Sequence, residues 1–143
     1  MTGAPTLGIA GALSIGLPLL LLQFVICIAL LVVGVAVYTK VTPFHEWELL
    51  RKGNVAAATI LTGAVIALAI PLAALLATTR TVLDIVVWGI VAILLQLVTV
   101  VVACHVMRRM RLSIDDGSLA AALPITAAQL AIALLNAAAM VPV

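Results

Sequence analysis

Residues 54–77 read NVAAATILTGAVIALAIPLAALLA, a run of 24 residues without a single charged side chain. A helix needs about 20 apolar residues to cross the hydrocarbon core of a bilayer. Transmembrane strands are only about 10 residues long and alternate in polarity, which this run does not do. The run therefore predicts a membrane-spanning helix.

Three more runs have the same character: residues 18–38, 85–107 and 118–140. Hydrophobic residues make up 66% of the chain and charged residues only 8%, which leaves too little polar surface for a soluble protein. The connections are short, so consecutive helices should be antiparallel neighbours. We expect an all-α membrane protein with four transmembrane helices, forming a single domain over residues 1–143.

Basic residues are unevenly divided among the connections. The second connection holds Arg80, whereas the first and third hold the other six: Lys40, Arg51, Lys52, Arg108, Arg109 and Arg111. Lys and Arg remain on the cytoplasmic side, so these two connections should be cytoplasmic and both termini periplasmic. No Lys or Arg precedes the first run, as a signal peptide would require, so we interpret that run as a retained helix.

The second and fourth runs resemble each other. A shift of 64 residues aligns them and gives ten identities over residues 53–74, beginning with Gly53 on Gly117 and Ala56–Ala58 on Ala120–Ala122. The first and third runs do not align. The match predicts a duplicated two-helix unit, about residues 18–80 and 82–143, arranged as a parallel repeat.

Several segments resemble the YjfL-like family, also called domain of unknown function 350. The central ones are Tyr38, Thr42–Glu46 and Leu50–Ala58; others are Pro71, Trp88-Gly89, Gln96 and Asn136–Met140. The resemblance covers about residues 18–140. It implies a small bacterial inner-membrane protein built from a duplicated helix pair, and it implies no known activity. The second copy has Ser118 in place of Asn54 and Asp115-Asp116 in place of Arg51-Lys52, so the two helix starts should not do the same job identically.

The start of the second helix is a candidate binding site. Free N–H groups there carry partial positive charge, Asn54 is a good N-cap, and Gly53 permits a sharp turn. Arg51 and Lys52 add full positive charges. These four residues are interpreted either as a site for an anionic group, such as a phospholipid head group, or as a capped helix with charges that set topology.

The first connection also holds His45, Glu46 and Glu48. One interpretation is an acid–base or metal cluster. The interpretation that we prefer is an interfacial helix, in which His45 and Glu48 share a face and Glu46 lies on another. Thr42 would cap that helix, Pro43 would begin it, and Phe44 and Trp47 would anchor it at the head groups. The spacing matches no metal motif, so we predict no metal, no cofactor and no catalytic residue.

Amide side chains interrupt the apolar runs at Gln23, Gln96, Gln129 and Asn136. An unpaired amide in hydrocarbon is costly, so Gln96, Gln129 and Asn136 should contact protein, as links between helices or as the lining of a polar path. Cys27 and Cys104 both lie inside apolar runs and are interpreted as small apolar residues.

The function we expect is a non-enzymatic structural or accessory component of a membrane assembly. A small channel or transporter subunit is the alternative, with the three amides lining its path. Dense i, i+4 stripes of small residues favour a homo-oligomer or a membrane-protein partner. Membrane lipids, including anionic phospholipid, are the other expected partners, and the scarcity of basic residues argues against nucleic acid.

The charge distribution makes topology testable. A reporter fused after Val143 should be periplasmic, because six of the seven basic residues lie in the first and third connections. A matched fusion truncated after Gly117 should be cytoplasmic. A cytoplasmic reporter after Val143 would contradict the predicted orientation.

Overall fold

The computed structural model describes residues 9–42, 45–79, 81–107, 109 and 111–141. Most of these residues lie in α-helices: α1 (Ile9–Val41), α2 (Glu46–Arg51), α3 (Val55–Thr78), α4 (Val82–Val106), α5 (Arg111–Asp115) and α6 (Leu119–Met140). Helices α1, α3, α4 and α6 are long and apolar enough to cross a membrane. The predicted all-α architecture with four membrane-spanning helices is confirmed.

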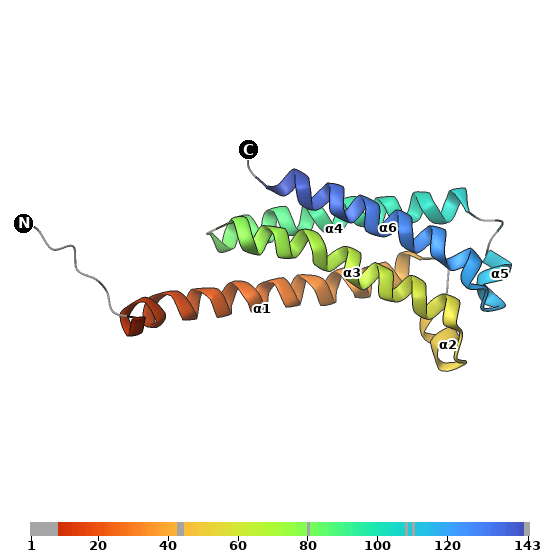
Figure 1. The fold of residues 1–143 in the computed structure, drawn as a ribbon, viewed down its shortest axis with the longest axis horizontal. Helices are drawn as coiled ribbons and strands as arrows, with labels where there is room; N and C mark the ends of the chain where they lie inside the picture. The colour runs from red at the N-terminus through yellow and green to blue at the C-terminus, as the bar shows by residue number, and fades with distance from the viewer. Residues whose placement is uncertain (1–8, 43–44, 80, 108, 110, 142–143) are drawn as a thin grey trace, which may run out of the picture.

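Helix α1 is longer than the apolar run from which it was predicted. That run begins at Pro18, whereas α1 begins at Ile9 and carries Pro18 in its interior. Pro is tolerated inside membrane helices because neighbouring groups can satisfy the freed backbone carbonyls. The residues before it contain no charge and no second proline within the helix, so nothing stops the helix there. Residues 13–22 are exposed, and this part of α1 extends beyond the other helices (Figure 1).

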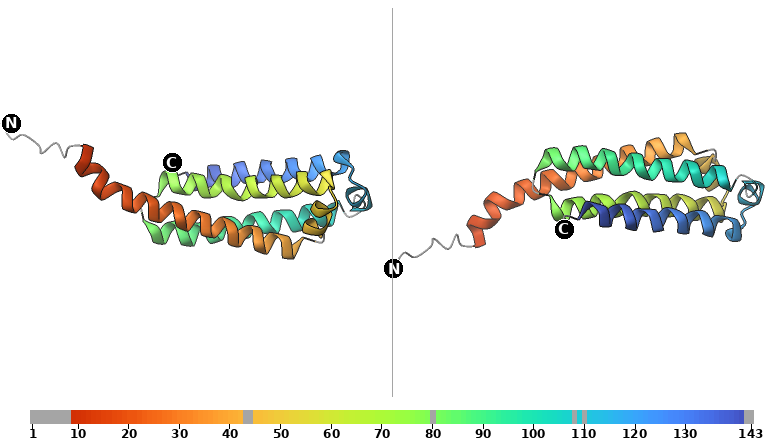
Figure 2. Two further views of the ribbon diagram at one scale, coloured as in Figure 1. Left: turned by 90° about the horizontal axis from the view of Figure 1, so that it is seen from below. Right: turned by 90° about the horizontal axis from the view of Figure 1, so that it is seen from above.

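The four long helices form two pairs. Figure 2 shows α3 beside α6 and α1 beside α4, with the two pairs packed on each other. Helices α2 and α5 lie together at one end of the bundle, which we call the α2–α5 end (Figure 1). Helix α1 begins and α6 ends at the opposite end, the terminal end. Which end faces the cytoplasm stays a prediction.

The α3–α6 pair makes the most extensive helix contact. Both helices carry small residues that are almost completely buried: Ala56, Ala57, Ala64 and Ala67 on α3, and Ala122 and Ala133 on α6. Gly63 lies against Thr126, whose hydroxyl donates a hydrogen bond to the Thr59 carbonyl at 3.5 Å. Small residues allow helix backbones in a membrane to approach closely and gain dispersion energy.

The two short connections at the α2–α5 end are closed in the same way. Gly53 and Gly117 have φ values of 75° and 83°, which favour glycine. The Asn54 N–H donates to the Leu49 carbonyl at 3.0 Å, and the Ser118 N–H donates to the Ser113 carbonyl at 2.8 Å. These pairs are related by the same 64-residue shift as the aligned sequences. The match is local to the two connections; duplication of the whole two-helix unit stays a prediction.

Packing at Gly63 should be sensitive to one methyl group. In Gly63→Ala the new Cβ would lie 2.5 Å from Cγ2 of Thr126. Thr is stiff at χ1, so its methyl cannot move aside freely. We expect a loss of about 1–3 kcal/mol, the usual range for overpacking, measured by thermal or denaturant unfolding in detergent.

Two variants control for this prediction. In Gly16→Ala the Cβ meets no atom within 4 Å, so no loss of stability is expected. Adding Thr126→Ser to Gly63→Ala removes the clashing methyl and should recover much of the loss. Equal stability of Gly63→Ala and the unmodified protein would contradict the proposed close contact.

Candidate functional site

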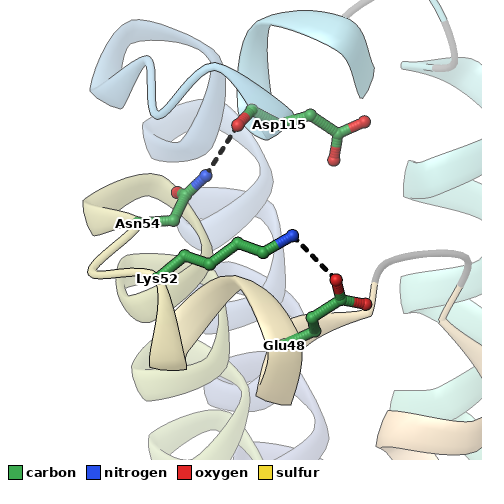
Figure 3. A network of polar contacts seen from close by, with 4 residues as sticks. All are labelled: Glu48, Lys52, Asn54 and Asp115. Carbon is green, nitrogen blue, oxygen red and sulfur yellow. Dashed lines mark hydrogen bonds and ion pairs between the residues drawn. The ribbon is translucent and has the colours of Figure 1, made fainter.

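The start of α3 is held by its own N-cap. The Asn54 side-chain oxygen accepts a hydrogen bond from the Ala57 N–H at 2.9 Å. Its amide nitrogen donates to the carbonyls of Ile114 and Asp115, at 2.9 and 3.0 Å. Figure 3 shows Asn54 reaching across to α5 in this way. One side chain thus caps α3 and also joins the two short connections.

The cations of the predicted anion site lie beside carboxylates. Lys52 forms an ion pair with Glu48 at 2.7 Å, and its ammonium lowers the pKa of the Glu48 carboxyl (Figure 3). Lys52, Gly53 and Asn54 line a shallow hollow together with Asp115 and Asp116. Arg51 lines a different hollow. The structure therefore divides Arg51, Lys52, Gly53 and Asn54 between two surfaces, and anion binding by them stays a prediction.

Helix α2 exists, but it does not begin as predicted. Thr42 was expected to be its N-cap; instead the Thr42 hydroxyl donates to the Tyr38 carbonyl at 2.9 Å and closes the end of α1. His45 occupies the N-cap position without a side-chain hydrogen bond. Thr42 is buried beside the last turn of α1, which explains why its hydroxyl bonds backwards along the chain. Pro43 and Phe44 lie outside the described residues.

Glu46 is the unexpected residue of α2. It is only 2% exposed, whereas His45, Trp47 and Glu48 around it are exposed. The Thr42 and Tyr38 hydroxyls lie close to its carboxylate, but neither carboxylate oxygen accepts a hydrogen bond of good distance and angle from the described residues. Burial raises the pKa of the Glu46 carboxyl from its usual 4.5 to about 7, and the nearby Thr42 and Tyr38 hydroxyls oppose this shift only in part.

Polar side chains continue from Glu46 into the bundle. The Tyr38 hydroxyl, which lies beside Glu46, accepts a hydrogen bond from the Gln129 amide at 3.3 Å. The Gln96 amide donates to the Gln129 backbone carbonyl at 2.9 Å. Tyr38, Gln96 and Gln129 are at most 1% exposed. The structure thus brings together side chains from α1, α2, α4 and α6.

Asn136 extends this series toward the terminal end. Its amide donates to the Ala92 carbonyl at 3.1 Å, and it is seven residues, or about 10 Å of helix, beyond Gln129. We call the series the polar column: Glu46, Tyr38, Gln129, Gln96 and Asn136. The amide nitrogens in it are bonded, but their oxygens are not: Oε1 of Gln96 and Gln129 and Oδ1 of Asn136 have no partner among the described residues.

A hollow lies at each end of the column. The α2 hollow, of about 530 Å³, is lined by polar groups of α1 and α2 that include Lys40, Thr42, His45, Glu46, Glu48 and Arg51. The terminal hollow, of about 340 Å³, is lined by Thr78, Thr79, Asp84, Trp88, Ala139 and Met140. Ala139 and Met140 follow Asn136 by three and four positions, so they share its face of α6.

The comparisons with known proteins establish a family. The family model described as Domain of Unknown Function (DUF350) matches residues 12–140. The chain belongs to the DUF350 family. UPF0719 inner membrane protein YjfL of Escherichia coli strain K12 is 29% identical over 117 residues, which cover 82% of this chain and 89% of that protein. The protein of the same name from strain O157:H7 matches equally, and no solved structure matches.

These findings confirm the family resemblance. With the four apolar helices, they identify this DUF350 chain as a multi-pass inner-membrane protein. Within the described residues, no group of three or more His, Cys, Asp or Glu side chains could hold a metal ion.

Sequence reasoning found three members of the polar column and missed two. It singled out Gln96, Gln129 and Asn136 because amides are rare in apolar runs. It placed Glu46 on a different helix face from His45 and Glu48, which is correct, but it had no sign of burial. Tyr38 was noted only for the family resemblance. The signal available for Glu46 was the position of an ionisable side chain a few residues after the end of a membrane helix.

The double use of Asn54 predicts an asymmetry between the α2–α3 and α5–α6 connections. Asn54→Ala should lower stability by about 0.5–2 kcal/mol through the lost cap. The loss should be larger than the cap alone accounts for, because the carbonyls of Ile114 and Asp115 also lose their donor. Ser118→Ala is the matched control, since its side chain forms no capping hydrogen bond. Equal losses in the two variants, measured by unfolding in detergent, would contradict the asymmetry.

Proposed function

We propose that this inner-membrane protein is a small channel or transporter subunit whose polar column carries a proton or small cation. The observation that supports it is the set of buried oxygens on Glu46, Gln96, Gln129 and Asn136 that accept no hydrogen bond within the described part of the chain. A buried acceptor left unsatisfied costs about 1–3 kcal/mol, so a purely structural bundle gains nothing by keeping several.

The chemistry of these oxygens limits the transported species. Carbonyl and carboxylate oxygens accept hydrogen bonds and attract positive charge, as they do in cation-selective pores. Each amide nitrogen, which could bind an anion, already donates one hydrogen bond, to the Tyr38 hydroxyl or to the backbone carbonyl of Gln129 or Ala92. Water, a proton carried by water, or a small cation therefore fits the column better than an anion.

The position of the column also favours a path over simple links between helices. Gln129 is ten residues, or about 15 Å, from the start of α6, and Asn136 lies one helical turn from its end. With Glu46 at the α2–α5 end, the column runs along most of the bundle between the two hollows. Gln96 and Gln129 are 1% and 0% exposed, so helices must separate before water reaches them.

The accessory role is the second candidate, and one observation favours it. Ala69, Ala73 and Ala77 form a stripe on α3 that is partly or fully exposed. This stripe is therefore not fully buried against the other helices of the chain. Such a stripe suits a second copy of the chain or another membrane protein. In either role we propose a non-enzymatic protein built from two related helix pairs, with bound lipid as its surroundings.

Replacing amides of the column should reduce ion flux without removing the fold. Gln96→Met and Gln129→Met keep the side-chain length but remove the acceptor oxygen. Flux of protons or K⁺ into liposomes should fall about tenfold or more, because a hydrogen bond to a charged group contributes about 1.5–3 kcal/mol and 1.4 kcal/mol is tenfold. The flux would be followed with a pH-sensitive or potential-sensitive dye under an imposed gradient.

Thr99→Val is the matched control for flux. Thr99 lies on α4 and is partly exposed, and its hydroxyl donates a hydrogen bond to the Leu95 carbonyl of its own helix, so flux should be unchanged. All variants would be compared at equal protein content, after thermal unfolding has verified that they are folded. Absence of flux in the unmodified protein would reject transport by this chain alone and favour the accessory role.

A further inference from the structure

We propose that Glu46 is a reversible proton-binding site, which takes up a proton from the α2 hollow and presents it to the polar column. The inference rests on the proposed function for its transport part, but the proton binding itself does not require transport. In each cycle a water-borne proton forms one O–H bond with the carboxylate, and the same bond breaks when the proton leaves. No other bond changes.

The geometry makes Glu46 the link between the hollow and the bundle interior. It lines the α2 hollow yet is only 2% exposed, so this residue lies at the base of that hollow. On its inner side lies the Tyr38 hydroxyl, which is already bonded to Gln129. A group in this position can exchange protons with water on one side and contact the column on the other.

The surroundings of Glu46 do not hold it permanently charged. The described titratable or charged residues that face it or share its hollow are Tyr38 and Lys40 from α1, His45, Glu48 and Arg51 from α2, and Cys104 from α4. Among the described residues, the ion pair in this region is Lys52 with Glu48, and none involves Glu46. An unpaired, buried carboxylate is costly, whereas the protonated acid can donate a hydrogen bond.

Burial changes the balance between the two forms near neutral pH. The pKa of the Glu46 carboxyl is raised to about 7, so the folded protein binds this proton where an unfolded chain has lost it. The resulting stabilisation is complete below about pH 4.5 and is lost as the pH rises through about 7. The sign is opposite to that of a carboxylate in an ion pair, such as Glu48.

The chain offers a direct test, because Glu46 and Glu48 are its only glutamates. Labelling the Glu side-chain carboxyl carbons with ¹³C should give two titrating resonances in the full chain in detergent micelles or nanodiscs. One should titrate with a midpoint near pH 7 and disappear in Glu46→Gln. The other should titrate at acidic pH and disappear in Glu48→Gln, the matched control. Acidic titration of both carboxyls would overturn the proposal.

Stability provides a second measurement that does not depend on assigning resonances. The melting temperature of the unmodified protein should fall between pH 5 and pH 8, while that of Glu46→Gln should change much less. Glu48→Gln should retain the fall. If Glu46→Gln fails to fold, Glu46→Asp keeps the titrating group, and its stability should still fall over this interval. A fall of equal size in Glu46→Gln would contradict the assignment.

Liposome flux separates this inference from the proposed function. If both hold, Glu46→Gln should abolish the pH dependence of proton flux, and Glu48→Gln should not. Titration near pH 7 without flux in any preparation would reject transport and leave the proton site intact. Proton flux that is unaffected by Glu46→Gln would overturn the role of Glu46 in the column.

Discussion

Hydrocarbon offers no hydrogen-bond partner, and this constraint governs the whole structure. Each spanning segment must satisfy its own backbone, so the chain is helical, and buried polar side chains must find partners inside the bundle. Gln96, Gln129 and Asn136 each donate a hydrogen bond to a neighbouring helix, but their side-chain oxygens accept none from the residues that the structure describes. All of these oxygens are hydrogen-bond acceptors, and they belong to the polar column between the two hollows. The bundle interior is therefore rich in hydrogen-bond acceptors, which helix packing alone does not require.

Close packing of α3 against α6 supports this arrangement. Small residues along both helices, with Gly63 at the tightest point, bring the two backbones together and hold Gln129 and Asn136 against α4. The same pair begins at two glycine turns with matching hydrogen bonds, and Asn54 ties these turns to each other. The hydrogen bonds of the polar column join this pair to α1 and α4.

Prediction from sequence succeeded where a single physical effect dominates. Long uncharged runs located the membrane helices, and the Asn54 cap and the Gly53 turn followed from local stereochemistry. It failed at α2, where Thr42 had two possible partners and the end of α1 provided the nearer one. It also placed the start of α1 too late in the chain, because Pro18 begins the apolar run but lies inside the helix.

The sequence by itself determined that this protein lies in a lipid bilayer, how many helices span it, and what local conformation the helix starts adopt. Each depends on composition or on residues a few positions apart. Only the tertiary structure decided that Glu46 is buried, that Tyr38 meets Gln129, and that Lys52 pairs with Glu48 beside two aspartates. Burial and pairing depend on which faces of distant helices meet. That choice is made by packing of many small side chains and is encoded in no short segment.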